Sequence, residues 1–312
     1  MDSSVLHTAT LKAEAQRLGF SACGIAPAEV VDSSDADFYT SHISAGRHGT
    51  MDYLARNLDK RFNPSLLHEG TRSIVSVAMN YYPEHRLTDS QYQFAWYAYG
   101  KDYHDVVRER LQQLLARLQH LYPGLTGRAF CDTAPVLERY WAWRCGLGWI
   151  GRSTQLVIPH AGSCFFLGEL FLTLPADTYD TPTANRCGTC RACIEACPMH
   201  ALSDDGLDAR RCLSYLTIEN RGDIPSDASE RMDNCIYGCD RCLKACPHNR
   251  FSQPTTVAEF APSPEFLSMS REAWHSLTPD DYRRLFKGSA VKRAKYDGLL
   301  RNIKAVRNKN KR

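Results

Sequence analysis

The sequence predicts an α+β protein in three regions: a mixed α/β N-terminal domain at 1–178, a small cysteine-rich module at 179–250 and a short basic helical C-terminus at 251–312. Three observations predict this arrangement. Helix-type and strand-type hydrophobic patterns alternate through the first region. Nine of the 13 cysteines lie in the second region. The third begins with a linker rich in Pro, Ser and Thr and then becomes strongly basic.

Hydrophobic periodicity determines the expected elements of the first region. The clearest is a helix at 102–121, where Val107 and a series of leucines fall on one face at helical spacing. The most apolar stretch, 164–174, contains Glu169 and predicts a buried strand rather than a membrane span. Further helices are expected at 5–18 and 135–145, and further strands at 21–26, 73–81, 127–131 and 156–158.

Two cysteine runs dominate the second region. They are Cys187-x2-Cys190-x2-Cys193-x3-Cys197-Pro198 and Cys239-x2-Cys242-x3-Cys246-Pro247. Bacterial two-cluster ferredoxins have this spacing, in which closely spaced thiolates bind one [4Fe–4S] cluster and the last cysteine of the run binds the other. A zinc site would more usually show paired C-x2-C steps, often with His, and disulfides would need a secreted protein. The spacing therefore predicts a ferredoxin-like module with two [4Fe–4S] clusters.

The crossover rule predicts every cluster ligand except one. One cluster is expected to bind the thiolates of Cys187, Cys190, Cys193 and Cys246. The other is expected to bind Cys197, Cys239, Cys242 and one further thiolate. Spacing leaves two candidates for that place: Cys235, four residues before Cys239, and Cys212, in a helix-like segment between the runs. The isolated thiols in apolar company are expected to be buried; these are Cys23, Cys131, Cys145 and Cys164.

Length and composition limit the class of protein. The 312 residues, 43% of them hydrophobic, suffice for about two domains with a sizeable core. No stretch is apolar enough to cross a membrane, and no export signal is visible at the N-terminus. Thiolate-bound clusters without such a signal predict a protein of the reducing cytoplasm.

Charge is distributed unevenly along the chain. Residues 283–312 contain twelve Lys and Arg against one acid, Asp297, which is a local charge of +11. The whole chain carries +3, so residues 1–282 carry −8. Such a segment is typical either of a polyanion contact or of an exposed, solvated helix end, and the sequence does not decide between them. No RNA-recognition motif of the RRM or KH kind accompanies it.

The first region lacks the motifs of common redox cofactors. No G-x-G-x-x-G follows a strand and no P-loop is present, and the glycines of 146–151 follow an expected helix and predict a loop. Residues 132–135 have the pattern of an ordinary helix start, with Asp or Thr as the cap and Pro in the first turn. Because some 180 residues precede the module, its clusters are expected to deliver electrons to a site in the same chain.

Several further motifs surround the cysteine runs. They are Lys101-Asp102-Tyr103-His104, Asp132-Thr133, Gly146-x-Gly148-Trp149, Gly162-Ser163-x-Phe165-Phe166-Leu167-Gly168-Glu169-Leu170, Arg211-Cys212-Leu213-Ser214-Tyr215-Leu216-Thr217 and Tyr237-Gly238-Cys239-Asp240. Together they resemble the epoxyqueuosine reductases, tRNA-modifying oxidoreductases that complete queuosine biosynthesis. The resemblance covers nearly the whole chain. It implies that the N-terminal domain binds cobalamin beside the two clusters, an arrangement shared with reductive dehalogenases.

The resemblance also implies roles for single residues. Cys212 becomes the remaining cluster ligand, and Cys235 becomes a spare thiol near that cluster. Asp132 becomes the proton donor, and a raised pKa beside a buried macrocycle would let its carboxyl act as an acid. His104 is expected to orient its neighbours rather than to bind cobalt. The implied cobalamin contacts are Arg61, Asp132, Gln155, Leu156 and Asp240.

The implied reaction is the two-electron deoxygenation of epoxyqueuosine to queuosine at the wobble position of tRNA. Clusters transfer single electrons, so cobalamin, which can accumulate two, suits the task. The implied partners are a tRNA anticodon loop, whose unstacked bases can enter a pocket, and an external electron donor such as a reductase, ferredoxin or flavodoxin. A monomer is expected. Tyr97, Tyr99 and Trp141 are candidates for stacking on a base, although core packing is the commoner role of such rings.

Two other functions fit part of these observations. A corrinoid reductive dehalogenase would use the same cofactors on a small halogenated substrate. The basic C-terminal segment and the absence of a visible twin-arginine signal count against it. A plain two-cluster electron carrier would need neither tRNA nor a corrin, and an absorption spectrum after reconstitution with cobalamin would distinguish it.

Overall fold

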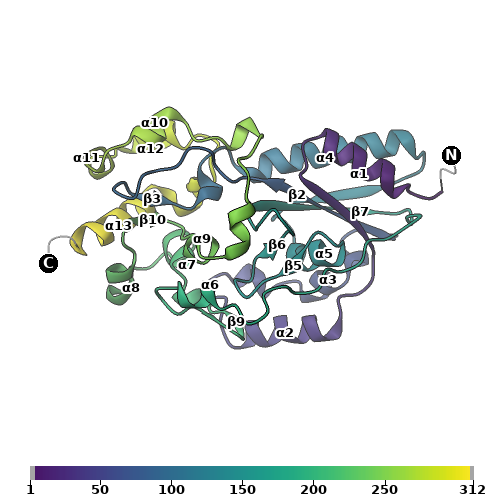
Figure 1. The fold of residues 1–312 in the computed structure, drawn as a ribbon, viewed down its shortest axis with the longest axis horizontal. Coiled ribbons are helices and arrows are strands. Elements are labelled where there is room, and N and C mark those ends of the chain that lie inside the picture. Colours follow the sequence, from purple (N-terminus) through teal and green to yellow (C-terminus); the bar gives the residue numbers. More distant parts are fainter. Residues whose placement is uncertain (1–3, 310–312) are drawn as a thin grey trace.

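A four-stranded antiparallel sheet forms the centre of the first region (Figure 1). The structure is a computed structural model that describes residues 4–309. The strand order is β1 (Ala22–Pro27), β2 (Ser73–Asn80), β7 (Phe165–Leu172) and β4 (Gly127–Phe130). β2 is buried along almost its whole length because it lies between β1 and β7 and has helices on both faces. The continuous apolar runs of β2 and β7 are those of strands with two covered faces.

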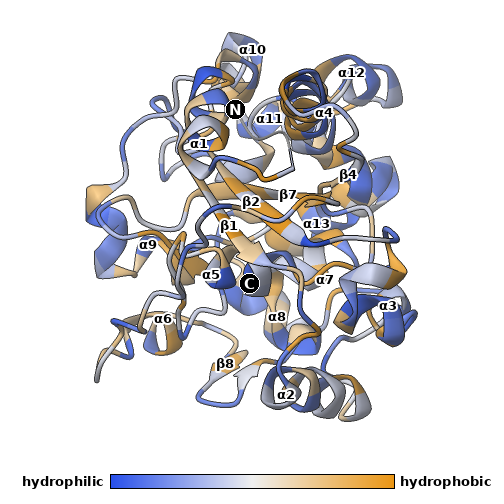
Figure 2. Ribbon diagram, turned by 90° about the vertical axis from the view of Figure 1, so that its right-hand side faces the viewer, coloured by the Kyte–Doolittle hydropathy of each residue, from blue (hydrophilic) through white to orange (hydrophobic). Residues whose placement is uncertain are grey.

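Helices cover both faces of this sheet. α1 (Thr8–Arg17) and α4 (Tyr103–Leu121) lie on one face, and α5 (Glu138–Arg144) lies on the other (Figure 1). α4 presents its apolar stripe to the sheet, burying Val107, Leu111, Leu114 and Leu118. In Figure 2 the hydrophobic strands lie between these helices, as expected of a layered core. α2 (Ser33–Ser44), α3 (Leu58–Phe62) and the hairpin of β5 (Trp149–Ile150) and β6 (Leu156–Val157) complete the region.

The cysteine-rich region consists of short elements joined by turns. Its helices are α6 (Ala192–Glu195), α7 (Leu213–Ile218), α8 (Ser226–Arg231) and α9 (Arg241–Lys244). Its strands are β8 (Leu202–Ser203), β9 (Gly206–Leu207) and β10 (Cys235–Tyr237). β10 pairs in parallel with β3 (Gln93–Phe94), so a segment from the first region is bound to the second.

The C-terminal region packs on the cysteine-rich region. Its helices are α10 (Pro264–Ser268), α11 (Arg271–His275), α12 (Pro279–Leu285) and α13 (Lys295–Lys309). α13 buries Leu299, Ile303 and Val306 in a core shared with β10 and α7. Arg301 donates hydrogen bonds to the carbonyl oxygens of Leu216, Asn220 and Gly222. The basic segment is therefore not merely an exposed, solvated helix end.

The structure confirms the α+β fold class and the expected elements of the first region, with small shifts at their ends. Two starts differ by more than one residue: α1 begins at Thr8 and α5 at Glu138, three residues later than expected in each case. The division at 178 and 250 stays a prediction, and residues 87–99 pack in the same core as α13. No helix within residues 4–309 is long and apolar enough to span a bilayer.

Candidate functional site

Five polar side chains gather where α4 begins and the β4–α5 loop passes. We call them the acid–base cluster: Asp102, Tyr103, His104, Asp132 and Glu138. α4 lies against β4, which brings the loop that follows β4 beside the first turn of the helix. Asp102 is the N-cap of α4 and accepts a hydrogen bond from the backbone N–H of His104 at 3.0 Å. This cap orients the first turn toward the loop.

Asp132 is held by contacts on two sides. Its Oδ2 accepts a hydrogen bond from the Tyr103 hydroxyl and lies 3.5 Å from Nε2 of His104. Its backbone N–H donates to the carboxylate of Glu138. The backbone of Asp132 has φ of 48°, a conformation that costs a non-glycine residue free energy and persists only where contacts hold it. The Asp132 side chain nevertheless remains 60% exposed, so its carboxylate is open to a ligand.

His104 bridges two carboxylates. Its Nδ1 lies 2.6 Å from Oδ1 of Asp102, and its Nε2 faces Asp132. Burial lowers the pKa of the imidazole, but these two carboxylates outweigh burial and raise the pKa to about 9. His104 therefore carries a proton at neutral pH. The expectation that it orients its neighbours describes the geometry, and the proton adds a possible role in acid catalysis.

The pKa of Asp132 is lowered in this structure, and the expectation of a raised pKa beside a bound macrocycle stays a prediction. Burial alone would raise the pKa of this carboxyl, but hydrogen bonds from His104 and Tyr103 stabilise its anion and lower the pKa below the ordinary value. The proton lies instead on Glu138 and His104. Burial and the neighbouring charge of Asp132 raise the pKa of Glu138 to about 8. Sequence reasoning missed Glu138 because its effect depends on packing.

The interpretation of residues 132–135 as a helix start is wrong. α5 begins only at Glu138, and no side chain caps its first turn. The left-handed φ of Asp132 places the residue in a loop instead. A second missed acid, Glu169 of β7, is fully buried, and burial raises its pKa well above the ordinary value. A glutamate in an otherwise apolar strand was the available signal for it.

Arg61 suits the binding of a polar cofactor group. The residue is only 7% exposed, and its guanidinium lies 5.3 Å from the centre of the Tyr39 ring. Its Nη2 donates to the Tyr53 carbonyl at 3.3 Å, whereas its buried Nε has no partner within the described part of the chain. Burial raises the pKa of Tyr53, and the Glu219 and Asp132 carboxylates raise it further. Because Arg61 contacts Tyr53 as well, Arg61 and Asp132 lie on two sides of the same region.

The other expected cobalamin contacts divide into two places. Gln155 and Leu156 belong to the β5–β6 hairpin, where Arg139 donates to the Thr154 carbonyl at 2.5 Å. The charge of Arg139 also lowers the pKa of Asp132, so this hairpin adjoins the acid–base cluster. Leu156 is buried and Gln155 is half-buried.

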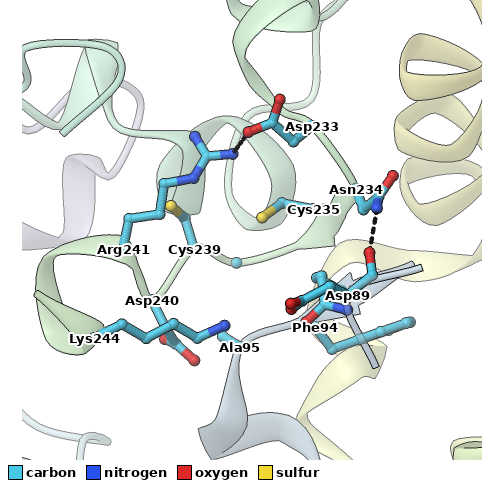
Figure 3. Close-up of a pocket in the computed structure, with 12 residues that line it drawn as sticks. Asp89, Phe94, Ala95, Asp233, Asn234, Cys235, Cys239, Asp240, Arg241 and Lys244 are labelled. Atoms are coloured by element: carbon cyan, nitrogen blue, oxygen red, sulfur yellow. Dashed lines mark hydrogen bonds and ion pairs between the residues drawn. The ribbon is translucent and has the colours of Figure 1, made fainter. Parts of the chain in front are cut away.

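Asp240 lies on the other side of Tyr97, whose pKa is raised by burial and then by the charges of both Asp240 and Asp132. Oδ2 of Asp240 accepts a hydrogen bond from the backbone N–H of Trp96 at 2.7 Å, and burial raises the pKa of this carboxyl to about 6. It lines a cavity of about 220 Å³ together with Cys235 and Cys239 (Figure 3). Among residues 4–309, no hydrogen bond or ion pair joins Asp240 to the acid–base cluster.

The eight expected ligand thiols fall into two spatial groups. Burial raises the pKa of Cys246 first, and the nearby thiols of Cys187 and Cys190 raise it further. The pKa of Cys193 is likewise raised by burial and then by the nearby thiols of Cys246 and Cys187. The structure thus brings these four together.

The second group forms around Cys212. Burial raises the pKa of Cys212 to about 11, with further contributions from Cys239 and Cys197. Burial also raises the pKa of Cys242, and the thiols of Cys239, Cys212 and Cys197 raise it further. Among the expected ligand thiols, Cys235 lies beside Cys239 only, and their hydrogen bond lowers the pKa of Cys239 to about 7. No three Cys, His, Asp or Glu side chains in the described chain converge as closely as a single metal ion requires. In a [4Fe–4S] cluster the four thiolates bind four separate irons.

Burial of the isolated thiols is confirmed for three of the four, and core packing is confirmed for two of the three aromatic candidates. Cys131, Cys145 and Cys164 are buried, and Cys23 is half-buried. Of the aromatic candidates for base stacking, Tyr99 and Trp141 are core residues with 5% and 1% exposure. Tyr97 is half-buried, and its hydroxyl contacts that of Tyr237 at 3.3 Å.

Two family models match this chain. Residues 61–133, which include Arg61 and Asp132, match "Epoxyqueuosine reductase QueG, DUF1730", and residues 186–249 match "4Fe-4S double cluster binding domain". An epoxyqueuosine reductase of Cellulophaga algicola is 41% identical over 97% of this chain and 99% of its own length. The chain belongs to the epoxyqueuosine reductase family. An iron–sulfur double-cluster domain is part of it.

Solved structures of epoxyqueuosine reductases share the fold. One, bound to an epoxyqueuosine-modified tRNA-Tyr stem loop, is 26% identical, with a TM-score of 0.88 over 96% of this chain and 80% of its own. A second, from Bacillus subtilis, has its catalytic aspartate loop swung out of the active site. It is 26% identical, with a TM-score of 0.86 over 96% of this chain and 81% of its own.

Proposed function

We propose that this chain reduces epoxyqueuosine to queuosine at the wobble position of tRNA. Family membership and the stem loop bound to a related epoxyqueuosine reductase support the substrate. The observation that carries the chemistry is the acid–base cluster, which stores protons beside the Asp132 carboxylate in a chain that also has a double-cluster domain. Neither a dehalogenase nor a plain electron carrier explains that combination as fully.

Proton supply follows from the proposed reaction. Converting an epoxide to an alkene and water consumes two electrons and two protons. His104 and Glu138, with pKa values of about 9 and 8, both hold protons at neutral pH and both contact Asp132. We infer that the Asp132 carboxylate takes a proton from His104 and passes it on to the epoxide oxygen. General acids of this kind contribute roughly 10²–10⁴-fold to rate.

The thiols would hold the two clusters in the two groups described above. One set is Cys187, Cys190, Cys193 and Cys246, and the other is Cys197, Cys212, Cys239 and Cys242. Cys212 is the better fourth ligand than Cys235, because it lies near three members of its group rather than one.

Cobalamin, when bound, would supply a carrier able to accumulate two electrons from one-electron clusters. Arg61 supports such binding through its buried, unpartnered Nε. The hairpin with Gln155 and Leu156 supports it by adjoining Asp132 through Arg139. The support for Asp240 is weaker, since its carboxylate already accepts from Trp96.

The loop that carries Asp132 would also move. In the Bacillus subtilis relative, the catalytic aspartate loop is swung out of the active site. Here Asp132 has a left-handed backbone, and its loop is held mainly by Tyr103, His104 and Glu138. We infer that this loop opens to admit the tRNA base and closes to bring the carboxylate to the epoxide.

The test uses protein reconstituted anaerobically with iron, sulfide and cobalamin. It is incubated with an epoxyqueuosine-containing tRNA stem loop and dithionite, and the nucleosides are analysed by mass. We expect queuosine with the parent protein and none when cobalamin is left out. Unchanged epoxyqueuosine in the complete mixture, with both clusters spectroscopically intact, would rule the proposed function out.

A further inference from the structure

We propose that a basic groove beside Cys246 is the docking surface for a small acidic one-electron carrier protein. This inference rests on the proposed function, because the clusters must be reduced from outside the chain. The groove has a volume of about 760 Å³. Its walls include Tyr82, Arg86, Trp96, Lys244, Cys246 and Arg250.

Aromatic rings, rather than carboxylates, hold the cations of this groove. Arg86 lies 5.3 Å from the centre of the Tyr82 ring and 5.5 Å from that of Trp96. The Lys244 ammonium lies 5.1 Å from the centre of the same Trp96 ring, and the Arg250 guanidinium lies 4.6 Å from the centre of the Phe251 ring. None of the three cations forms an ion pair with another side chain in the described part of the protein.

This arrangement leaves the groove with a net positive charge. A cation–π contact orients a cation without neutralising it, whereas Arg144 and Arg293 elsewhere are paired with carboxylates. One acid, Asp89, is among the lining residues. Oriented, unpaired cations suit an acidic protein surface, because complementary charge steers association and speeds it by roughly 10–10³-fold at low salt.

The groove also reaches a proposed cluster ligand. Cys246 lies in its wall, and its thiol belongs to the group with Cys187, Cys190 and Cys193. A carrier seated there would meet the cluster at a ligand sulfur. In each step the carrier loses one electron and the cluster gains it, so two such steps supply the two electrons needed to reduce one epoxide. Cys190 is exposed, whereas the four thiols around Cys212 are all half-buried, which places the Cys190 group nearer the surface.

Two observations favour a protein rather than RNA in this groove. Trp96 is only 7% exposed and Arg86 and Lys244 cover it, so its ring is not free to stack on a base. The next residue, Tyr97, turns away from the groove. The centre of its ring lies 6.2 Å from that of Tyr103 and 6.3 Å from that of Tyr237. The groove and the acid–base cluster therefore lie on opposite sides of the segment that contains Trp96 and Tyr97. The carrier protein and the tRNA could thus bind at the same time.

The experiment compares a groove variant, Arg86→Glu with Arg250→Glu, against a control, Arg17→Glu with Arg108→Glu, which changes the same charge on exposed helix surfaces. The probe is an acidic flavodoxin. Its dissociation constant is measured by calorimetry at two salt concentrations, and cluster reduction is followed with flavodoxin and with dithionite.

We expect the groove variant to bind flavodoxin at least tenfold more weakly, with a shallower salt dependence. The control should stay within about twofold of the parent. Reduction by dithionite should be unchanged in both, which separates a failed docking surface from a failure of the proposed function.

Parent-like flavodoxin affinity in the groove variant would overturn the proposal. So would a loss of stem-loop affinity with unchanged flavodoxin binding, because the groove would then be an RNA surface. Iron content and cluster absorption report on folding. Should the double variant lose its clusters, the single variants Arg86→Gln and Arg250→Gln take its place, with an expected weakening of about threefold each; no weakening in either also overturns the proposal.

Discussion

The acid–base cluster and the thiol groups would perform the two halves of one reaction, yet they are constructed differently. In the acid–base cluster, opposite charges and hydrogen bonds stabilise one another: His104 lies between two carboxylates, and its pKa rises to about 9. In the thiol groups, like charges meet: burial raises the pKa of Cys242 and Cys246, and neighbouring thiolates raise it further. The polar network is thus complete within the chain, whereas the thiols require cluster iron to offset their mutual repulsion.

This difference predicts which changes damage which half. Changes to the thiols should cost iron and all activity that depends on it. Changes to the acid–base cluster should cost turnover and leave the iron in place.

The largest expected effect is that of Cys212→Ala. It should lose about half of the iron and essentially all turnover, because one [4Fe–4S] cluster lacks its fourth thiolate. The matched control, Cys235→Ala, should keep near-full iron, since Cys235 adjoins only Cys239 among the expected ligand thiols. Iron analysis and cluster absorption measure both. Equal iron in the two variants, or loss in Cys235→Ala only, would reverse the ligand assignment.

Asp132→Asn should come next, with turnover lower by on the order of 10²–10⁴-fold. The amide keeps the shape of the side chain but has no proton to deliver to the epoxide oxygen. Iron content and cobalamin absorption should match the parent, because neither depends on this carboxylate's proton. Parent-like turnover of epoxyqueuosine in the stem loop would move the acid to another residue, with Glu138 the first candidate.

A smaller loss, on the order of tenfold, is expected for His104→Gln, because Asp132 remains but regains its proton slowly. The parent's turnover should fall as pH rises through about 9, where His104 deprotonates. Since the folded pKa is raised, His104 also stabilises the fold fully below pH about 6.5, and this stabilisation is lost as pH rises through about 9. A pH–rate profile of His104→Gln that keeps the same alkaline fall would contradict this role.

The smallest effect on turnover is expected for Ile303→Ala in α13. Ile303 is 2% exposed, and its core also packs against Cys197, Cys212 and Cys239. Truncation should lower the free energy of unfolding by about 2–5 kcal/mol, measured by denaturant titration. The turnover of the protein that remains folded should not change. A stability like that of the parent would mean that α13 is an exposed helix end and not part of the core.

The sequence by itself determined the parts of this protein that depend on neighbours along the chain. Hydrophobic periodicity predicted α4 and the sheet strands, because one face of α4 and the whole of β2 must be buried. The spacing of the cysteine runs predicted the clusters, since short turns bring their thiols together whatever the rest of the fold does. Even Asp132 was found as a residue of interest, through a resemblance that extends along the whole chain.

Only the tertiary structure decided the states of these residues. The pKa of Asp132 is lowered because hydrogen bonds from His104 and Tyr103, at the start of α4, outweigh the effect of burial. Cys212 gathers with its group while Cys235 does not, although Cys235 is nearer to Cys239 in sequence. The basic C-terminal segment contributes a core helix because Ile303 meets β10 and α7. Proton affinity, ligand choice and burial all depend on which groups lie within a few ångströms, and contacts between distant segments set that environment.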